Sequence, residues 1–179
     1  MNDNYPSTTG ARPGSTDAVD AIVGLTPSDP LFAIRHARHK VVHATQGSYE
    51  LFFDPSSQGL PIQERLLVAW HASLLSRSDA LARHYRDALD RYASDAEAMA
   101  AIEGGRVDSL PPSRLRAMLI FTRKLILKPV EGDQAALEQL RDAGMATADI
   151  VTLAQLVAFL SYQIRLVAGL SAMKALESL

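Results

Sequence analysis

Hydrophobic positions recur at helical spacing along almost the whole chain, and no stretch shows the alternation that is typical of a β-strand. The pattern predicts an all-α fold of seven or eight helices. The predicted helices cover residues 17–25, 28–53, 61–75, 79–102, 111–127, 133–143 and 147–172. The last of these has few charges and is apolar around much of its circumference, so we expect it at the centre of the domain or at a subunit interface.

Residues that start, cap or break helices define these segments. Pro30 and Pro61 each stand where a helix begins, a position that proline favours. The polar residues 76–79 are expected to break the helical pattern, and Thr147 is expected to cap the last helix. The first 16 residues are rich in Ser, Thr, Gly, Pro and Asn, which predicts a disordered tail. Residues 17–179 are then one domain, long enough for a full hydrophobic core.

Charge and hydropathy point to a cytoplasmic protein. The net charge is −2 and the pI is near 6.2, so we expect no nucleic acid partner and no attraction to an anionic membrane. The N-terminus lacks the apolar core of a secretory signal. The longest apolar run, "DIVTLAQLVAFLSY", is interrupted by Thr152 and Gln155, and we expect it to be too short to span a membrane.

The chain contains no cysteine, which excludes disulfides, thiol catalysis and thiolate metal sites within it. The histidines of "RHARHKVVH" (His36, His39 and His43) would share one stripe of a helix and could suggest a metal site. However, the segment carries several positive charges and no nearby carboxylate, and one straight helix rarely wraps three ligands around an ion. We therefore expect no metal and no cofactor.

Large side chains at helical spacing are expected to form the core: Trp70, Met118, Phe121, Phe159 and Tyr162. Arg165 lies within the most apolar helix, so we expect it to need a partner from another helix or a neighbouring subunit.

Five segments, in this order and spacing, carry a resemblance to a known family: "HATQGSYELFF", "LPIQERLLVAWHASLL", "ALARHYRDAL", "LRAMLIFTRKLIL" and "DAGMATADIVTLAQLVAFLSYQIRLVAGL". From about residue 38 to 170 the chain resembles the alkylhydroperoxidase-D-like and carboxymuconolactone decarboxylase superfamily, in particular its peroxidase-related branch. The resemblance implies a helical domain that assembles into dimers, trimers or hexamers.

Active members of that family have a glutamate followed, after eleven intervening residues, by a first cysteine. A second cysteine follows after two more residues, and a histidine after a further three. Counted from Glu64, the cysteine positions hold Ser76 and Asp79, and the histidine lies one residue late, at His84. A thiolate attacks the peroxide in that chemistry and a second thiol closes a disulfide, which a serine and an aspartate cannot do. We expect Ser78 and Asp79 to cap a helix here instead.

Three hypotheses about the function are consistent with these sequence features. The favoured one is a structural or regulatory partner of a cysteine-bearing relative, in a homo- or hetero-oligomer and without thiol peroxidase activity of its own. The second is a proton-transfer enzyme of the decarboxylase or isomerase type. It would use Glu64 with His71, seven residues away on the same helical face, or with His84. The third is a subunit of a peroxidase complex whose thiols come from a partner.

Overall fold

The computed structural model of the chain describes residues 17–92 and 95–177, so the predicted disordered tail, 1–16, lies outside the described residues. Within the described ranges there are nine α-helices, two short 3₁₀ helices and no strand, which confirms the all-α fold. The α-helices are α1 (Ala18–Val23), α2 (Pro30–His36), α3 (His39–Phe53), α4 (Ile62–Leu75), α5 (Asp79–Leu89), α6 (Ala96–Glu103), α7 (Arg114–Leu127), α8 (Gln134–Asp142) and α9 (Thr147–Glu177). The 3₁₀ helices are η1 (Val107–Ser109) and η2 (Pro129–Glu131).

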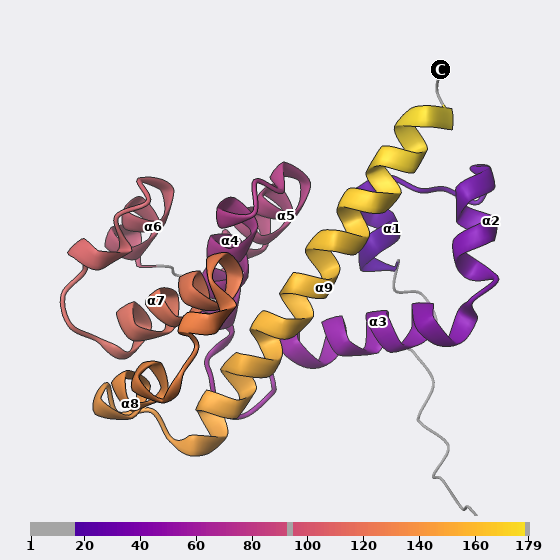
Figure 1. Cartoon of the computed structure of the whole chain (residues 1–179). Coiled ribbons are helices and arrows are strands. Elements are labelled where there is room, and N and C mark those ends of the chain that lie inside the picture. The colour runs from indigo at the N-terminus through magenta and orange to yellow at the C-terminus, as the bar shows by residue number, and fades with distance from the viewer. Residues whose placement is uncertain (1–16, 93–94, 178–179) are drawn as a thin grey trace, which may run out of the picture.

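Helix α9 runs diagonally through the molecule and separates two groups of helices (Figure 1). Helices α4 to α8 lie on one side of it, and α1 to α3 lie on the other. Helix α4 is the centre of the larger group, because it packs against α3, α5, α6, α7 and α9. Ten of its fourteen residues are buried, so α4 joins most of the fold to one hydrophobic core.

Most of the expected core residues are buried. Trp70, Met118, Phe121 and Phe159 all lie in the interior, as the spacing predicts. The expectation for Tyr162 is wrong, because 42% of this residue is exposed. Its ring lies on the open side of α9, where its hydroxyl contacts α3 across the surface.

Two expected helices are each divided. The segment 28–53 forms α2 and α3, with a break at Ala37 and Arg38 that no glycine or proline announces. The segment 79–102 forms α5 and α6, and Asp95 caps α6 by accepting hydrogen bonds from two backbone N–H groups. Between α2 and α3, contacts of α2 with α1 override the local helical pattern. Between α5 and α6, the sequence prediction did not recognise Asp95 as a capping residue.

Helix α9 is longer than the sequence suggests. It is continuous over 31 residues instead of ending near residue 172. By length and composition alone its segment Thr147–Leu176 could cross a membrane, which corrects the expectation from "DIVTLAQLVAFLSY". In the structure α9 packs against α1, α2, α4, α7 and α8, as the core helix of a globular domain does.

The break between α4 and α5 is a tight helix end. Arg77 adopts a left-handed conformation with φ of 53°, which is uncommon for a residue other than glycine. The backbone N–H of Ser78 donates to the carbonyl of Ser73 at 2.9 Å, and that of Arg77 donates to Leu74 at 3.0 Å. These bonds satisfy carbonyls at the end of α4 and turn the chain directly into α5.

Candidate functional site

Glu64 lies in the first turn of α4 and is held by α7. Its Oε1 accepts a hydrogen bond from Nη2 of Arg114 at 2.8 Å, in an ion pair that is partly exposed. Its other oxygen, Oε2, is buried and makes no hydrogen bond. The carboxylate that the resemblance would assign to proton handling is therefore paired with a cation inside the same chain.

His71 lies two turns further along α4 and is almost completely buried. The pKa of His71 is lowered to about 4, chiefly by burial and also by the nearby charge of Arg123, while the backbone of Leu119 partly opposes the shift. Neither ring nitrogen makes a hydrogen bond of acceptable geometry. The imidazole is consequently neutral at pH 7 and shut off from solvent.

His84 lies on α5 and is held by α3. Its Nε2 is 2.8 Å from the hydroxyl of Tyr49, and the two rings are 5.7 Å apart. Burial lowers the pKa of His84, Asp87 opposes this, and Arg91 adds to the lowering. A neutral imidazole accepts the hydrogen bond of a phenol, so Tyr49 and His84 form a neutral pair at pH 7.

The three candidate residues thus have different neighbours. Glu64 and His71 lie on the side of α4 that faces α7, since Arg114, Leu119 and Arg123 all belong to α7. His84 faces α3 instead. A proton-transfer site requires that the carboxylate and an imidazole reach one substrate in one cavity. The two cavities described below are lined by other residues.

The positions that correspond to the family's cysteines lie at the break between α4 and α5. Ser76 is half-buried and ends α4, while Asp79 is exposed and begins α5. Ser78 occupies the N-cap position as expected, but its side chain makes no capping hydrogen bond. The predicted position of the N-cap is therefore correct, but the predicted side-chain hydrogen bond is not formed.

The three histidines of "RHARHKVVH" do not share one helix. His36 ends α2, whereas His39 and His43 belong to α3, so the expected single stripe is wrong. His36 instead binds a buried carboxylate, with its Nε2 2.7 Å from Asp20. Among the residues that the structure describes, no group of three or more His, Asp or Glu side chains could hold a metal ion.

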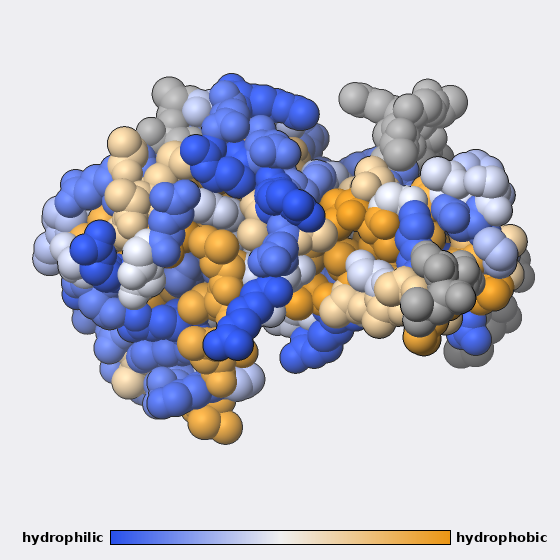
Figure 2. Space-filling view, turned by 90° about the horizontal axis from the view of Figure 1, so that it is seen from above, coloured by the Kyte–Doolittle hydropathy of each residue, from blue (hydrophilic) through white to orange (hydrophobic). Residues whose placement is uncertain are grey.

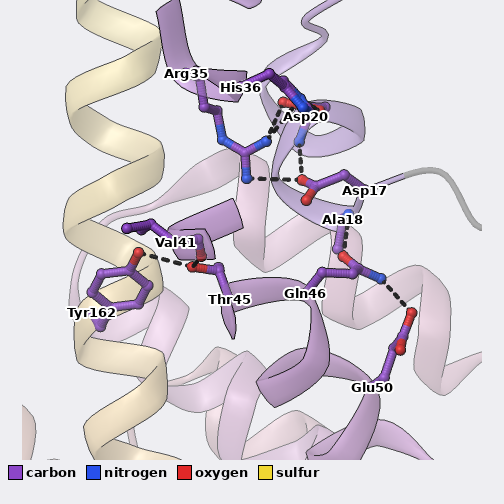
Figure 3. A network of polar contacts seen from close by, with 10 residues as sticks. All are labelled: Asp17, Ala18, Asp20, Arg35, His36, Val41, Thr45, Gln46, Glu50 and Tyr162. Carbon is purple, nitrogen blue, oxygen red and sulfur yellow. Dashed lines mark hydrogen bonds and ion pairs between the residues drawn. The ribbon is translucent and has the colours of Figure 1, made fainter. Parts of the chain in front are cut away.

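Asp20 is the centre of a polar network that joins α1 to α2 (Figure 3). One oxygen of this buried carboxylate accepts from Arg35 Nη1 at 2.7 Å, and the other contacts His36. Arg35 also reaches Asp17 at 3.0 Å. Buried charges require such pairing, so this network fixes the position of α2.

The same network continues from α1 to α3 and α9. The backbone N–H of Ala18 donates to the side chain of Gln46 at 2.8 Å (Figure 3). Thr45 donates to the carbonyl of Val41, which leaves the hydroxyl of Tyr162 to donate to Thr45 at 2.9 Å. The bond between Thr45 and Tyr162 therefore joins α3 to α9, and the bond between Ala18 and Gln46 joins α3 to α1.

An apolar groove lies between α2 and α3 on one side and α9 on the other. Two adjoining cavities occupy it, of about 240 and 340 Å³, and both are lined by Val41, Thr45 and Tyr162. The large apolar side chains that line the two cavities are Leu31, Ile34, Val41, Val42, Phe159, Tyr162, Leu166, Leu170 and Met173. Seen from above, hydrophobic surface is visible in the hollow between the two lobes of the molecule (Figure 2).

Large apolar side chains are exposed around this groove. Ile34 is 62% exposed, Val41 53% and Met173 47%. Basic side chains lie at its edge, because Arg38 is part of the lining of one cavity and Lys40 of the other. An exposed apolar surface with a polar rim is typical of an interaction site.

Sequence reasoning did not identify this groove or the partners of the candidate residues. Tyr49 and Arg114 are 35 and 50 residues from their partners in the chain, so no local pattern joins them. Exposed apolar positions in helix 28–53, such as Ile34 and Val41, were a usable signal for the groove. Arg165 is exposed and donates to the backbone carbonyl of Ser161 at 2.9 Å, so it does not need the partner that we expected.

No protein-family model matches the sequence, and no curated protein sequence matches it.

Proposed function

We propose that this protein is a helical assembly subunit that works by binding another protein chain and has no thiol peroxidase activity of its own. On this proposal it is a structural or regulatory component of an oligomer, and a cysteine-bearing relative is one partner that it could serve. The groove between α3 and α9 is the observation that carries the proposal, because it exposes apolar side chains that a monomer would gain by burying.

The chemistry of the polar residues supports the same conclusion. A thiol peroxidase needs a thiolate, and the chain has no cysteine. Glu64 is paired with Arg114, His84 with Tyr49, and His71 is buried. These contacts leave no solvent-open pair of acid and base among the three, so we rank proton-transfer catalysis below binding.

Peroxide turnover is the first test. The purified chain, assayed with a hydroperoxide and a dithiol donor, is expected to give the uncatalysed rate. Turnover well above that rate, retained after rigorous removal of contaminating thiol enzymes, would contradict the proposal. Addition of a cysteine-bearing relative tests the version in which a partner supplies the thiols, since that version requires the mixture to exceed the relative alone.

Native mass spectrometry is the second test. We expect the chain to form an oligomer, either with itself or with the cysteine-bearing relative, and we expect Met173→Glu to reduce it because this side chain lines the groove. Leu137→Glu is the matched control, since Leu137 is similarly exposed (38%) but belongs to α8. A monomer under every condition, or equal effects of the two variants, would overturn the proposal.

A further inference from the structure

The smaller of the two groove cavities, of about 240 Å³, has walls from three helices. Helix α2 contributes Leu31 and Ile34, α3 contributes Val42, and α9 contributes Leu170 and Met173. The larger cavity, of about 340 Å³, is lined by α3 and α9 alone. Together the adjoining cavities fall in the range of about 300–1,000 Å³ that is usual for small-molecule sites, and their mostly apolar walls are also typical of such sites.

The polar groups inside the groove already have partners within the chain. The hydroxyl of Thr45 donates to the carbonyl of Val41 at 2.9 Å, and the hydroxyl of Tyr162 donates to Thr45 at 2.9 Å (Figure 3). Arg35 also lines the smaller cavity, but its side chain is only 6% exposed and is paired with Asp20. An occupant of the interior therefore needs no hydrogen-bonding group there, and an alkyl chain fits these surroundings.

The two walls are in contact where the cavities adjoin. Thr45 and Tyr162 line both cavities, and the hydrogen bond between their hydroxyls joins α3 to α9 at this point. An α-helix is about 10–12 Å across with its side chains, so it cannot enter between walls that such a bond already joins. A helix of another protein would lie over the opening of the groove, whereas a slender chain reaches the interior.

Two cations lie where α2 meets α3. Arg38 lines the smaller cavity and Lys40 the larger one, and both residues are exposed. Neither is ion-paired with a carboxylate of residues 17–92 or 95–177. Among the described residues that line the two cavities, none is acidic. Positive charge alone therefore borders the apolar interior, which favours an occupant with one anionic end.

We propose that the groove binds a straight-chain aliphatic carboxylate of the fatty-acid class, one molecule per chain. The alkyl tail lies along α9 and the carboxylate lies beside Arg38. From Tyr162 to Met173 helix α9 rises about 17 Å, so its lining side chains give the tail a continuous apolar wall. The inference goes beyond the proposed function and does not rest on it, because a small ligand requires no partner chain.

Isothermal titration calorimetry with dodecanoate, kept below its micelle concentration, tests this site. We expect saturable binding of one dodecanoate per chain, and each methylene removed from the tail should weaken it about three- to fourfold. Dodecyltrimethylammonium has the same tail and the opposite charge, so it should bind about tenfold more weakly at low ionic strength. Absence of saturable binding, or equal affinities for the two amphiphiles, would overturn the proposal.

Matched variants locate the ligand. Arg38→Gln should weaken dodecanoate binding about fivefold at low ionic strength, whereas Arg141→Gln, at an exposed arginine of α8, should leave it unchanged. Met173→Glu should abolish binding because it places a negative charge in the lining of the smaller cavity, and Leu137→Glu is its control on α8. Equal effects within either pair would overturn the site.

Two further outcomes would identify a different occupant and overturn the inference. Binding to phosphatidylglycerol vesicles without binding of free dodecanoate would make this face a membrane surface. An oligomer that Met173→Glu disrupts, in a chain that never binds dodecanoate, would assign the groove to a partner chain and leave the proposed function intact. Conversely, a chain that binds dodecanoate and stays monomeric under every condition would refute the assembly role and leave the ligand site intact.

Discussion

The α4–α5 segment and the exposed face of α3 and α9 differ in which side chains they bury and which they expose. In α4 and α5, the residues that could have done chemistry are turned inward: Glu64 meets Arg114, His84 meets Tyr49, and His71 is buried. On α3 and α9, side chains that could have been buried are turned outward, Val41 and Tyr162 among them.

This contrast distinguishes side chains that stabilise the fold from side chains that are available at the surface. Polar groups in the α4–α5 segment contribute to the fold because their partners come from α7 and α3. Apolar groups on α3 and α9 do not contribute to the fold to the same extent, since they remain in water. The difference is our reason for proposing contact with another chain, and not turnover at Glu64, as the function.

The largest expected effect is on the Asp20 network, which joins α2 to α1. Asp20→Asn removes a buried charge that pairs with Arg35 and His36, so the free energy of unfolding should fall by about 3 kcal/mol. Urea denaturation measures it. Asp108→Asn is the control, because its ion pair with Arg123 is largely exposed and should contribute less than about 1 kcal/mol. Equal losses would mean that the position of α2 does not depend on a buried charge network.

The next effect is the pH dependence of stability that the buried His71 of α4 produces. Native His71 binds a proton only near pH 4, whereas the unfolded chain binds it near pH 6.5. Stability is therefore full above about pH 6.5 and declines as the pH falls toward 4, by about 3 kcal/mol in total. The lowered pKa of His84 acts in the same direction. In His71→Leu most of this decline should vanish, and an unchanged pH profile would show that His71 is not sealed in the core.

A smaller effect concerns Gly47 in the middle of α3. Gly47→Ala should raise the stability of the dilute monomer by about 0.5–1 kcal/mol, because alanine favours the helix and the site is open. Gly24→Ala serves as the matched control, since Gly24 has φ of 72° and alanine is strained there. Thermal unfolding of both variants would contradict the account if Gly47→Ala were the less stable.

The smallest effect is expected at Glu64. Glu64→Gln weakens a partly exposed ion pair with Arg114, so the loss of stability should be about 0.5–1 kcal/mol. Self-association should not change, because Glu64 lies away from the groove-lining residues. Loss of the oligomer in this variant, measured by sedimentation, would move the functional surface to the α4–α5 segment.

Local patterns predict the helices of this fold better than their connections. The start of α2 at Pro30 and the break after α4 follow from proline and polar residues in the sequence. The break between α2 and α3 has no such mark, because contacts of Arg35 and His36 with α1 produce it. Arg77 is a further case, since the left-handed conformation that ends α4 was not expected of an arginine.

The candidate site was predictable only in part. That Glu64 and His71 share a face of α4 follows from their spacing. Their partners, Arg114 and the buried surroundings on α7, depend on long-range packing that one sequence does not reveal. The groove depends on the placement of α3 beside α9, where Tyr162 bonds Thr45 from 117 residues away in the chain.

Amide hydrogen exchange at low and high protein concentration tests the central claim most directly. The account predicts that protection increases with concentration in α3, around Val41 to Leu51, while the α4–α5 break around Ser76 to Asp79 exchanges at the same rate throughout. Unchanged exchange in α3 at every concentration, or new protection confined to the α4–α5 break, would contradict it.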